Sequence, residues 1–439
     1  MTSTSADYVI IGAGPAGLSA AAIFARNEKR VLLIDQYQIP GGQYWRHKYG
    51  EKFPSEKFEF LIRSPFVEWH LQTTVWQIEQ KEQSLVIHLR TAAGTTTIRA
   101  GKLLVATGAI ERSIPIPGWT LPGVITAGGL QSLIKGHSTS PGNSIVLGGS
   151  GPFLFPVVES LLDMKNPPTI KGVFEYRSNF RWWRNTLGLI LNPEKALAAI
   201  KFLLFLKRQK IRFETGVNIF KIEGTSSGLN IHLAKKRASQ SIIENVEVAA
   251  ISYGFTPDLT IPSILKLERE IVFGEESVKV DSNQRGSVNN VWAAGEVTGI
   301  GGHELAITEG KIAALSMLGK SRSSTFSKIN RFRQKVFASG LAKIYAPSRD
   351  WMDWSTEDFI ICRCEEVKKS EIIDSFKKLG ADSARTSKLF TRAGMGMCQG
   401  RICHRNVSDL AERFTEGKEV LSPVSRPIGG AVTLGELSD

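Results

Sequence analysis

The chain has 439 residues, of which 42% are hydrophobic, and a formal net charge of +13. This length allows two or three buried cores, and the hydrophobic content excludes a disordered or fibrous protein. Known nucleic-acid modules and basic clusters interleaved with aromatic residues are absent from the sequence. A solvated surface accounts for most Lys and Arg, so we expect a modular globular protein that binds no nucleic acid.

Two stretches bear on location in the cell. Met1–Asp7 is polar and lacks the basic start and long apolar core of a secretory signal. The apolar stretch Leu187–Leu206 is interrupted by charged residues such as Lys195 and Lys201, which a membrane-spanning helix would have to desolvate. We therefore expect a cytoplasmic protein in which this stretch forms an amphipathic surface helix.

A strand, a glycine turn, a helix and a second strand are predicted over Asp7–Asp35, where the motif GAGPAG follows an apolar run. Gly12 permits the tight turn, Gly14 lets a pyrophosphate approach the backbone, and Gly17 allows the helix to pack closely on the strand. The helix N-terminus then faces the phosphates. Asp35 lies where a carboxylate accepts hydrogen bonds from ribose hydroxyls. We assign this dinucleotide site to FAD.

Gly41, Gly42 and Gln43 follow the acidic end of the second strand. A glycine pair at this point would let the backbone lie close to a flavin. An ordinary surface turn explains the same residues equally well.

A second unit of the same kind begins at Ser144 and ends near Glu175. Gly149 and Gly151 supply two of the expected glycines, but Leu154 takes the third position, where a side chain would displace the helix or the phosphate. Glu175 suits a ribose diol. Three arginines could instead pair with a 2′-phosphate or be solvated surface, namely Arg177, Arg181 and Arg184. NAD(P) binding is thus left open, with Leu154 arguing against it.

The remaining segments complete an α/β protein with two Rossmann-like domains and a small helical module. Alternating apolar and polar residues in VEWHLQTTVWQIEQ and over 84–109 predict an antiparallel layer, and the pattern recurs over 211–254. We predict a discontinuous FAD-binding domain over 1–140 and 255–320, an NAD(P)-type domain over 141–254, a linker over 321–358 and a 2Fe-2S-binding module with tail over 359–439.

All four cysteines lie in the last fifth of the chain, as Cys362, Cys364, Cys398 and Cys403. Four thiolates are a complete ligand set for an iron–sulfur cluster. Glycines around the third cysteine, at Gly394, Gly396 and Gly400, allow a tight loop that aims backbone N–H groups at sulfur. A zinc site of the same thiolates is the alternative, but such sites commonly use two CxxC knuckles, and neither pair has that spacing.

The residues resemble flavoproteins with the glutathione-reductase-like fold, and among them the alpha-type subunits of opine oxidases, hydrogen cyanide synthase and heterotetrameric sarcosine oxidase. The resemblance runs from Ala6 to about Glu436, and its most specific piece is VATGAIERSIPIPGWTLPGVITAGGLQSLI. The segment from ICRCEEV to GMGMCQGRICHR resembles the bacterioferritin-associated-ferredoxin-like 2Fe-2S module, with Met397 where the family usually has Pro.

The resemblance implies a set of FAD contacts. Glu296 departs from the family's usual Asp, and His303, beside it, has no partner evident in sequence and is assigned no catalytic role. No catalytic residue is predicted. The implied cofactor-binding residues are Gly12, Gly14, Pro15, Ala16, Gly17, Asp35, Gln36, Gly42, Gln43, Ala106, Thr107, Gly108, Gly295 and Glu296.

The resemblance also implies an electron-transfer subunit of a heteromeric amine or amino-acid dehydrogenase or oxidase of opine type. Its expected partners are an amino-acid-oxidase-like second flavoprotein and a small ferredoxin-like subunit. One alternative is a self-contained NAD(P)H-dependent reductase that passes electrons through the cluster; another is a non-catalytic assembly subunit. The basic stretch Lys195–Arg212 could dock a partner or contact an anionic membrane peripherally.

Overall fold

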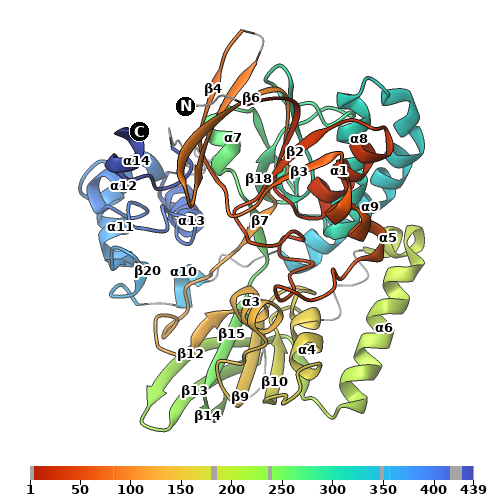
Figure 1. Ribbon diagram of the computed structural model, residues 1–439. Helices are drawn as coiled ribbons and strands as arrows, with labels where there is room; N and C mark the ends of the chain where they lie inside the picture. The colour runs from red at the N-terminus through yellow and green to blue at the C-terminus, as the bar shows by residue number, and fades with distance from the viewer. Residues whose placement is uncertain are drawn as a thin grey trace.

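The computed structural model describes residues 4–82, 84–178, 185–235, 240–346, 351–354, 356–415 and 428–438. Figure 1 shows one sheet with its helices in the upper part, a second sheet below it, and a mainly helical module on the left. The two sheets and the module correspond to the three kinds of unit that the sequence predicts.

The upper sheet has the order β3-β2-β1-β6-β5-β4, with β19 also paired to β6. β1, β2, β3, β6 and β19 pair in parallel, whereas β4, β5 and β6 pair antiparallel. The antiparallel layer is thus joined to the Rossmann sheet through the long β6, but VEWH forms β3 in the parallel part. The strands are β1 (Thr4–Ile11), β2 (Val31–Ile34), β3 (Val67–His70), β4 (Thr74–Gln80), β5 (Leu85–Thr91), β6 (Gly94–Val105) and β19 (Val291–Ala293).

Helices α1 (Pro15–Arg26) and α8 (His303–Met317) pack on each other against this sheet. Gly310 of α8 allows a close approach of the two helices, because a Cβ there would lie 2.1 Å from the Ala16 carbonyl oxygen. Because β19 and α8 follow the second sheet in sequence, the chain returns to the first sheet, as predicted. Shorter elements here are α2 (Glu56–Glu59), η1 (Phe60–Arg63), α7 (Thr260–Ile264), β17 (Arg269–Val272), β18 (Glu275–Val278) and η3 (Glu296–Thr298).

The lower sheet is parallel and has the order β11-β10-β9-β15-β8. An antiparallel sheet, β12-β13-β14, adjoins it, which confirms the pattern predicted over 211–254. The elements are β8 (Val124–Thr126), α3 (Ala127–His137), β9 (Ser144–Gly149), α4 (Leu154–Leu162), β10 (Thr169–Glu175), α5 (Thr186–Leu191), α6 (Pro193–Arg208), β11 (Phe213–Thr215), β12 (Val217–Thr225), β13 (Gly228–Lys235), β14 (Ser241–Val246) and β15 (Val248–Ser252).

Two short strands connect the sheets, β7 (Ala109–Glu111) and β16 (Phe255–Pro257), which pair antiparallel. β8 and α3 precede residue 141 and yet lie with the second sheet, so strand pairing begins that unit at Val124. The domain boundaries as a set stay a prediction.

The predicted linker contains the helix α9 (Thr325–Tyr345), which packs on α8 and α5. The C-terminal module follows this helix. Buried module residues such as Trp351, Ile361 and Val407 share one core with β12, β13 and β14 of the second unit. The module is therefore packed onto the body. Its elements are η4 (Ser321–Ser324) before α9, then α10 (Trp351–Trp354), β20 (Ile360–Cys362), β21 (Val367–Lys368), α11 (Lys369–Lys377), α12 (Ala384–Thr391), α13 (His404–Phe414) and α14 (Leu434–Ser438).

Candidate functional site

The first glycine turn has the geometry that a pyrophosphate requires. A Cβ atom on Gly12 (φ +108°) would lie 2.2 Å from the Ala106 carbonyl oxygen, and one on Gly17 would lie 1.9 Å from the Gly12 carbonyl oxygen. A Cβ on Gly14 would meet no atom within 4 Å. Gly14 is the N-cap of α1 and makes no side-chain cap bond, so the first-turn amides are left for an anion. Pro15 and Ala16 begin the helix.

Asp35 lies at the end of β2, across from this turn. Its carboxylate accepts hydrogen bonds from the backbone N–H groups of Ala13 (2.6 Å) and Tyr37 (2.9 Å). Burial raises the pKa of Asp35, and these hydrogen bonds and the Arg46 cation oppose the rise. The side chain is thus fixed beside the turn, where a ribose diol would lie, and Gln36 next to it is exposed.

The glycine pair after β2 packs directly on the phosphate turn. The Gly41 N–H donates to the Ala13 carbonyl (2.9 Å), and a Cβ on Gly42 (φ +60°) would lie 2.9 Å from the Gly14 Cα. Of the two interpretations that the sequence left open, this contact favours a role at the dinucleotide site over an ordinary surface turn. Gln43 is exposed and donates to the Tyr37 hydroxyl (3.0 Å).

The turn Ala106–Gly108 leaves β6 beside the first glycine turn. The Ala106 N–H donates to the Ile11 carbonyl (2.8 Å), which holds the turn against β1. The Thr107 hydroxyl donates to the Asp258 carbonyl (3.1 Å), and the Asp258 N–H donates to the Gly108 carbonyl (3.0 Å). Asp258 therefore orders this turn. The sequence had not indicated this role of Asp258.

A buried carboxylate also orders the turn at Gly295. Glu309 accepts hydrogen bonds from the Gly295 N–H (3.1 Å) and the Thr298 hydroxyl (2.9 Å), and it pairs with Arg331 (2.9 Å). Glu309 was missed, although a glutamate in an otherwise buried helical stretch is itself a signal. Glu296 is half-buried; burial raises its pKa, and a hydrogen bond from the Gly302 N–H opposes this.

His303 begins α8 and stacks on Tyr44, with ring centroids 3.8 Å apart. Burial lowers the pKa of His303, so the neutral ring is favoured. The stack supplies the packing partner that was not evident in the sequence.

The second glycine turn repeats the first in part. A Cβ on Gly149 (φ +132°) would lie 1.7 Å from the Ser252 carbonyl oxygen, and one on Gly151 would meet nothing within 4 Å. Glu175 accepts from the Gly151 N–H (2.9 Å) and the Arg177 N–H (2.8 Å), as Asp35 does in the first unit. Burial raises the pKa of Glu175 to about 7.

The helix after the second turn starts later. α1 begins at Pro15, directly after Gly14, whereas α4 begins only at Leu154, three residues after Gly151. Leu154 is buried in the core, and Phe153 lies edge-on against Phe255 (4.9 Å). The first helical turn, which would face a phosphate, is therefore missing. Of the three arginines, Arg181 and Arg184 lie outside the described residues.

The four cysteines form an inner and an outer pair. Cys362 and Cys403 are buried, whereas Cys364 is exposed and Cys398 is half-buried. The thiols lie within hydrogen-bonding range of each other inside each pair. Among the described residues, no three or more His, Cys, Asp or Glu side chains surround a single metal position. Two pairs fit a two-iron cluster, in which each iron takes two protein ligands.

The glycine loop packs closely on these sulfurs. The Gly394 N–H points at the Cys362 sulfur (3.4 Å), and a Cβ on Gly396 would lie 2.4 Å from the Cys364 Cβ. Hydrogen bonding, from the Cys403 thiol above all, lowers the pKa of Cys362 to about 6, which favours a thiolate there. The nearby Cys362 sulfur raises the pKa of Cys403. The predicted N–H contact thus exists, but at the first cysteine.

Two hydrogen bonds join the cysteine module to residues 105–134, the segment VATGAIERSIPIPGWTLPGVITAGGLQSLI on which the family resemblance depends most. The Trp119 indole N–H donates to the Ile360 carbonyl (2.9 Å), two residues before Cys362. The Asn406 side chain donates to the Ser113 carbonyl (2.9 Å). Gly118 (φ +90°) permits the turn, because a Cβ there would lie 2.0 Å from the Ile222 carbonyl oxygen. Part of segment 105–134 therefore holds the cysteine module in place.

A buried cluster of ion pairs also joins the cysteine module to the body of the molecule. Arg112 contacts Glu275 (3.1 Å) and Asp409 (2.6 Å), and Arg405 contacts Asp409 (3.2 Å). Burial raises the pKa of Glu275, and the two arginine cations oppose the rise. Two cations and two carboxylates balance in charge, and removing one partner of such a cluster costs about 3–5 kcal/mol. None of these residues was predicted as functional.

Hydrogen bonds continue from the turn at Gly108 to the cysteine loop. The Thr260 N–H donates to the Asp258 carboxylate (3.0 Å), and Arg401 donates to the Thr260 hydroxyl (3.4 Å). Arg401 also donates to the carbonyl of Cys398 (3.5 Å). Because Asp258 is itself bonded to the turn, the candidate flavin turn and the candidate cluster are connected through three residues.

Comparisons with known proteins agree with this geometry. Residues 6–152 match the family model described as pyridine nucleotide-disulphide oxidoreductase, and residues 360–413 match that described as BFD-like [2Fe-2S] binding domain. The A chain of the opine oxidase from Rhizobium meliloti is 28% identical, over 99% of this chain and 98% of the relative. Hydrogen cyanide synthase subunit HcnB of Pseudomonas aeruginosa is 29% identical, over 94% of each chain.

Among solved structures, L-proline dehydrogenase from P. horikoshii matches with a TM-score of 0.71 and 19% identity, over 99% of this chain and 79% of that one. At this identity the match concerns the fold. The chain is an oxidoreductase with two Rossmann-like domains that binds FAD, and its C-terminal domain binds a 2Fe-2S cluster. It is similar over nearly its full length to the opine oxidase relative and to HcnB, which supports the resemblance that the sequence indicated. Within the described residues, no helix is long and apolar enough to cross a membrane.

Proposed function

We propose that the chain is the electron-transfer subunit of a heteromeric dehydrogenase or oxidase that acts on an amine or an amino acid of opine type. The route of hydrogen bonds from Gly108 through Asp258, Thr260 and Arg401 to Cys398 is the observation that carries the proposal. Electrons pass between bound groups more readily along a continuous bonded path than across a gap. The route therefore supports exchange between the two cofactors.

The chain's own residues have distinct tasks in this scheme. Bound FAD accepts electrons in pairs and releases them singly, while a 2Fe-2S cluster carries one electron. The turn at Gly14 receives the pyrophosphate, and Asp35 receives the ribose. The buried cluster around Arg112 keeps the cysteine module at a constant position on the body. The other predicted cofactor-binding residues are part of the same proposed FAD site: Gln36, Gly42, Gln43, Ala106, Thr107, Gly108, Gly295 and Glu296.

The partners that we propose are a second, amino-acid-oxidase-like flavoprotein and a small ferredoxin-like subunit. Both full-length relatives are named as subunits of an enzyme, which supports assembly with further chains. The outer cysteine pair supports contact at the module, since Cys364 is exposed and Met397, beside the half-buried Cys398, is 96% exposed. An electron carrier docked there would lie directly over the sulfurs.

Purification of the complex from the native host tests this function. We expect a second flavoprotein to co-purify and one of a panel of amino acids and opines to bleach the flavin under anaerobic conditions. The electron paramagnetic resonance signal of a reduced 2Fe-2S cluster should then appear. A chain that purifies alone, with cofactors inert to every substrate and reductant, would instead support a non-catalytic assembly subunit.

Arg401→Met tests the route itself. The substitution keeps the length of the side chain and removes the donors to Thr260 and Cys398. We expect normal flavin and iron contents but slower appearance of the cluster signal after flavin bleaching. Arg392→Met is the matched control, because Arg392 pairs with Glu365 on the exposed side of the module. Equal rates in both variants would contradict the route.

A self-contained NAD(P)H-dependent reductase is the second candidate. The open space at Gly151 and the position of Glu175 favour it. The late start of α4 and the buried Leu154 oppose it. We therefore rank it below the electron-transfer function.

A further inference from the structure

One surface of the molecule is apolar and is not covered by any described part of the chain. α5 and α6 expose six large aliphatic side chains by 42% to 70%: Leu187, Ile190, Leu197, Ile200, Leu203 and Leu204. On α6 they recur at spacings of three and four, which aligns them along one stripe. The opposite side of α6 faces the body, where Phe202 is buried against Phe155 (ring centroids 4.2 Å). The stripe therefore does not contribute to the hydrophobic core.

Cations border this stripe. Lys201, Lys207, Arg208 and Lys210 are exposed, and none of the four forms an ion pair with a described residue. The sequence contains no Asp or Glu between Glu194 and Arg212. Because nothing within the described chain neutralises these charges, the surface fits an anionic counterpart.

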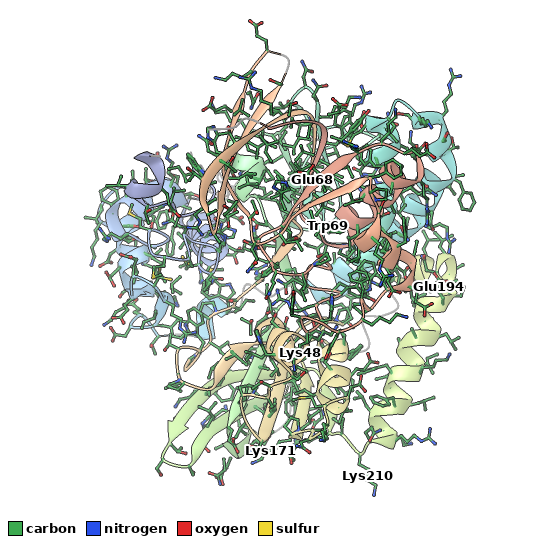
Figure 2. All side chains as sticks on the ribbon, in the orientation of Figure 1. Lys48, Glu68, Trp69, Lys171, Glu194 and Lys210 are labelled. Atoms are coloured by element: carbon green, nitrogen blue, oxygen red, sulfur yellow. The ribbon has the colours of Figure 1, made fainter. Side chains whose placement is uncertain are left out.

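The position of α6 allows contact with an extended surface. Figure 2 labels Glu194 near one end of the helix and Lys210 just beyond the other, along the lower right edge of the molecule. Sixteen residues give a helix about 24 Å long. Figure 1 places the cysteine module on the opposite side of the view, so docking at α6 would leave the module free.

We propose that the α5–α6 face docks this protein peripherally on an anionic phospholipid bilayer. An aliphatic stripe bordered by Lys and Arg is the pattern of helices that lie in the plane of a membrane interface. Lys is depleted from protein–protein interfaces, where aromatic residues and Arg prevail, whereas three of the four cations here are Lys. Two copies of this face would bring like charges together, which opposes self-association.

Vesicle sedimentation with the full, cofactor-loaded chain tests the proposal. Vesicles of phosphatidylcholine with phosphatidylglycerol should bind the protein, and pure phosphatidylcholine vesicles should bind it much less. Binding should weaken as salt is added, because salt screens the attraction. K201Q/K207Q/K210Q should lower the partition coefficient by roughly two orders of magnitude, since each cation near an anionic surface contributes about fivefold.

The control triple, K29Q/K165Q/K266Q, removes the same charge from exposed positions elsewhere. We expect it to bind as the unaltered protein does. Equal loss in both triples would overturn the proposal, because net charge alone would then explain binding. So would equal binding to neutral and anionic vesicles, or no binding to either.

Ile200→Glu with Leu204→Glu tests the apolar stripe, with Ile271→Glu plus Leu434→Glu as the control at other exposed aliphatic positions. Only the first pair should abolish sedimentation with vesicles, at unchanged flavin and iron contents. If the first pair instead dissolves a dimer or releases a partner protein and leaves vesicle binding intact, the face is a protein interface and the proposal fails.

Discussion

The two glycine turns of this chain occupy equivalent places in two sheets and differ in the helices that they begin. In both, the first glycine lies against the end of a neighbouring strand of its sheet, and the second glycine faces open space. In both, backbone N–H groups of the turn also fix an acidic side chain, Asp35 or Glu175. They diverge at the third position, where Gly17 lets α1 start at once and Leu154 belongs to the core of a helix that starts late. The same arrangement of strands and glycines can thus begin helices of different start, which is why we expect an anion site at the first turn and none at the second.

The largest expected effect is at this third position. Leu154→Ala should lower the free energy of unfolding by about 2–5 kcal/mol, because a buried leucine leaves a cavity. Flavin content should stay unchanged. Gly17→Ala, in contrast, should reduce flavin content, since its Cβ would lie 1.9 Å from the Gly12 carbonyl oxygen and would displace the turn. Chemical denaturation and cofactor analysis measure both; loss of flavin in Leu154→Ala would contradict the comparison.

A second effect is the pH dependence of stability that Glu175, the acid of the second turn, produces. The folded state raises the pKa of Glu175 from 4.5 to about 7, so its stabilising contribution is complete below pH 4.5 and is lost as the pH rises through about 7. Glu175→Gln removes this dependence. The unfolding free energy of the variant minus that of the unaltered protein should therefore grow by about 3 kcal/mol over that window. Parallel curves against pH would show that Glu175 is charged throughout.

The sequence predicted more of the fold than of the contacts between its parts. The turn at Gly12, the acid at Asp35 and the four cysteines are local patterns, and each lies where the spacing indicated. Arg112 could not be found this way, because its partners are 163 and 297 positions away in the chain. Glu309 and Arg401 also act through tertiary contacts, which no periodicity reveals. The late start of α4 depends on how Leu154 packs, so spacing alone did not predict it.

A smaller effect is expected at the second glycine of each turn. Gly14→Val places a side chain in space that only a ligand would fill, and its φ of −78° tolerates the change. Overpacking of this kind costs about 1–3 kcal/mol, so FAD affinity should fall by roughly one to two orders of magnitude. The apoprotein should be as stable as before. Gly151→Ala, at φ +118°, should cost stability but not FAD, as a titration with each apoprotein would show.

The smallest expected effect is that of nicotinamide nucleotides on the unfolding transition. A ligand at one hundred times its Kd stabilises the folded state by about 2.7 kcal/mol, so FAD added to the apoprotein should raise the melting temperature clearly. NADH and NADPH should leave that temperature unchanged and should not bleach the flavin, because the second turn lacks the first helical residues that would hold their phosphates. Glu175→Gln provides the matched control: a rise with NADH that this substitution abolishes would place a nucleotide at the second turn, because Glu175 suits the ribose diol of NADH. Both copies would then have kept their anion sites, and the reductase function would replace the electron-transfer function.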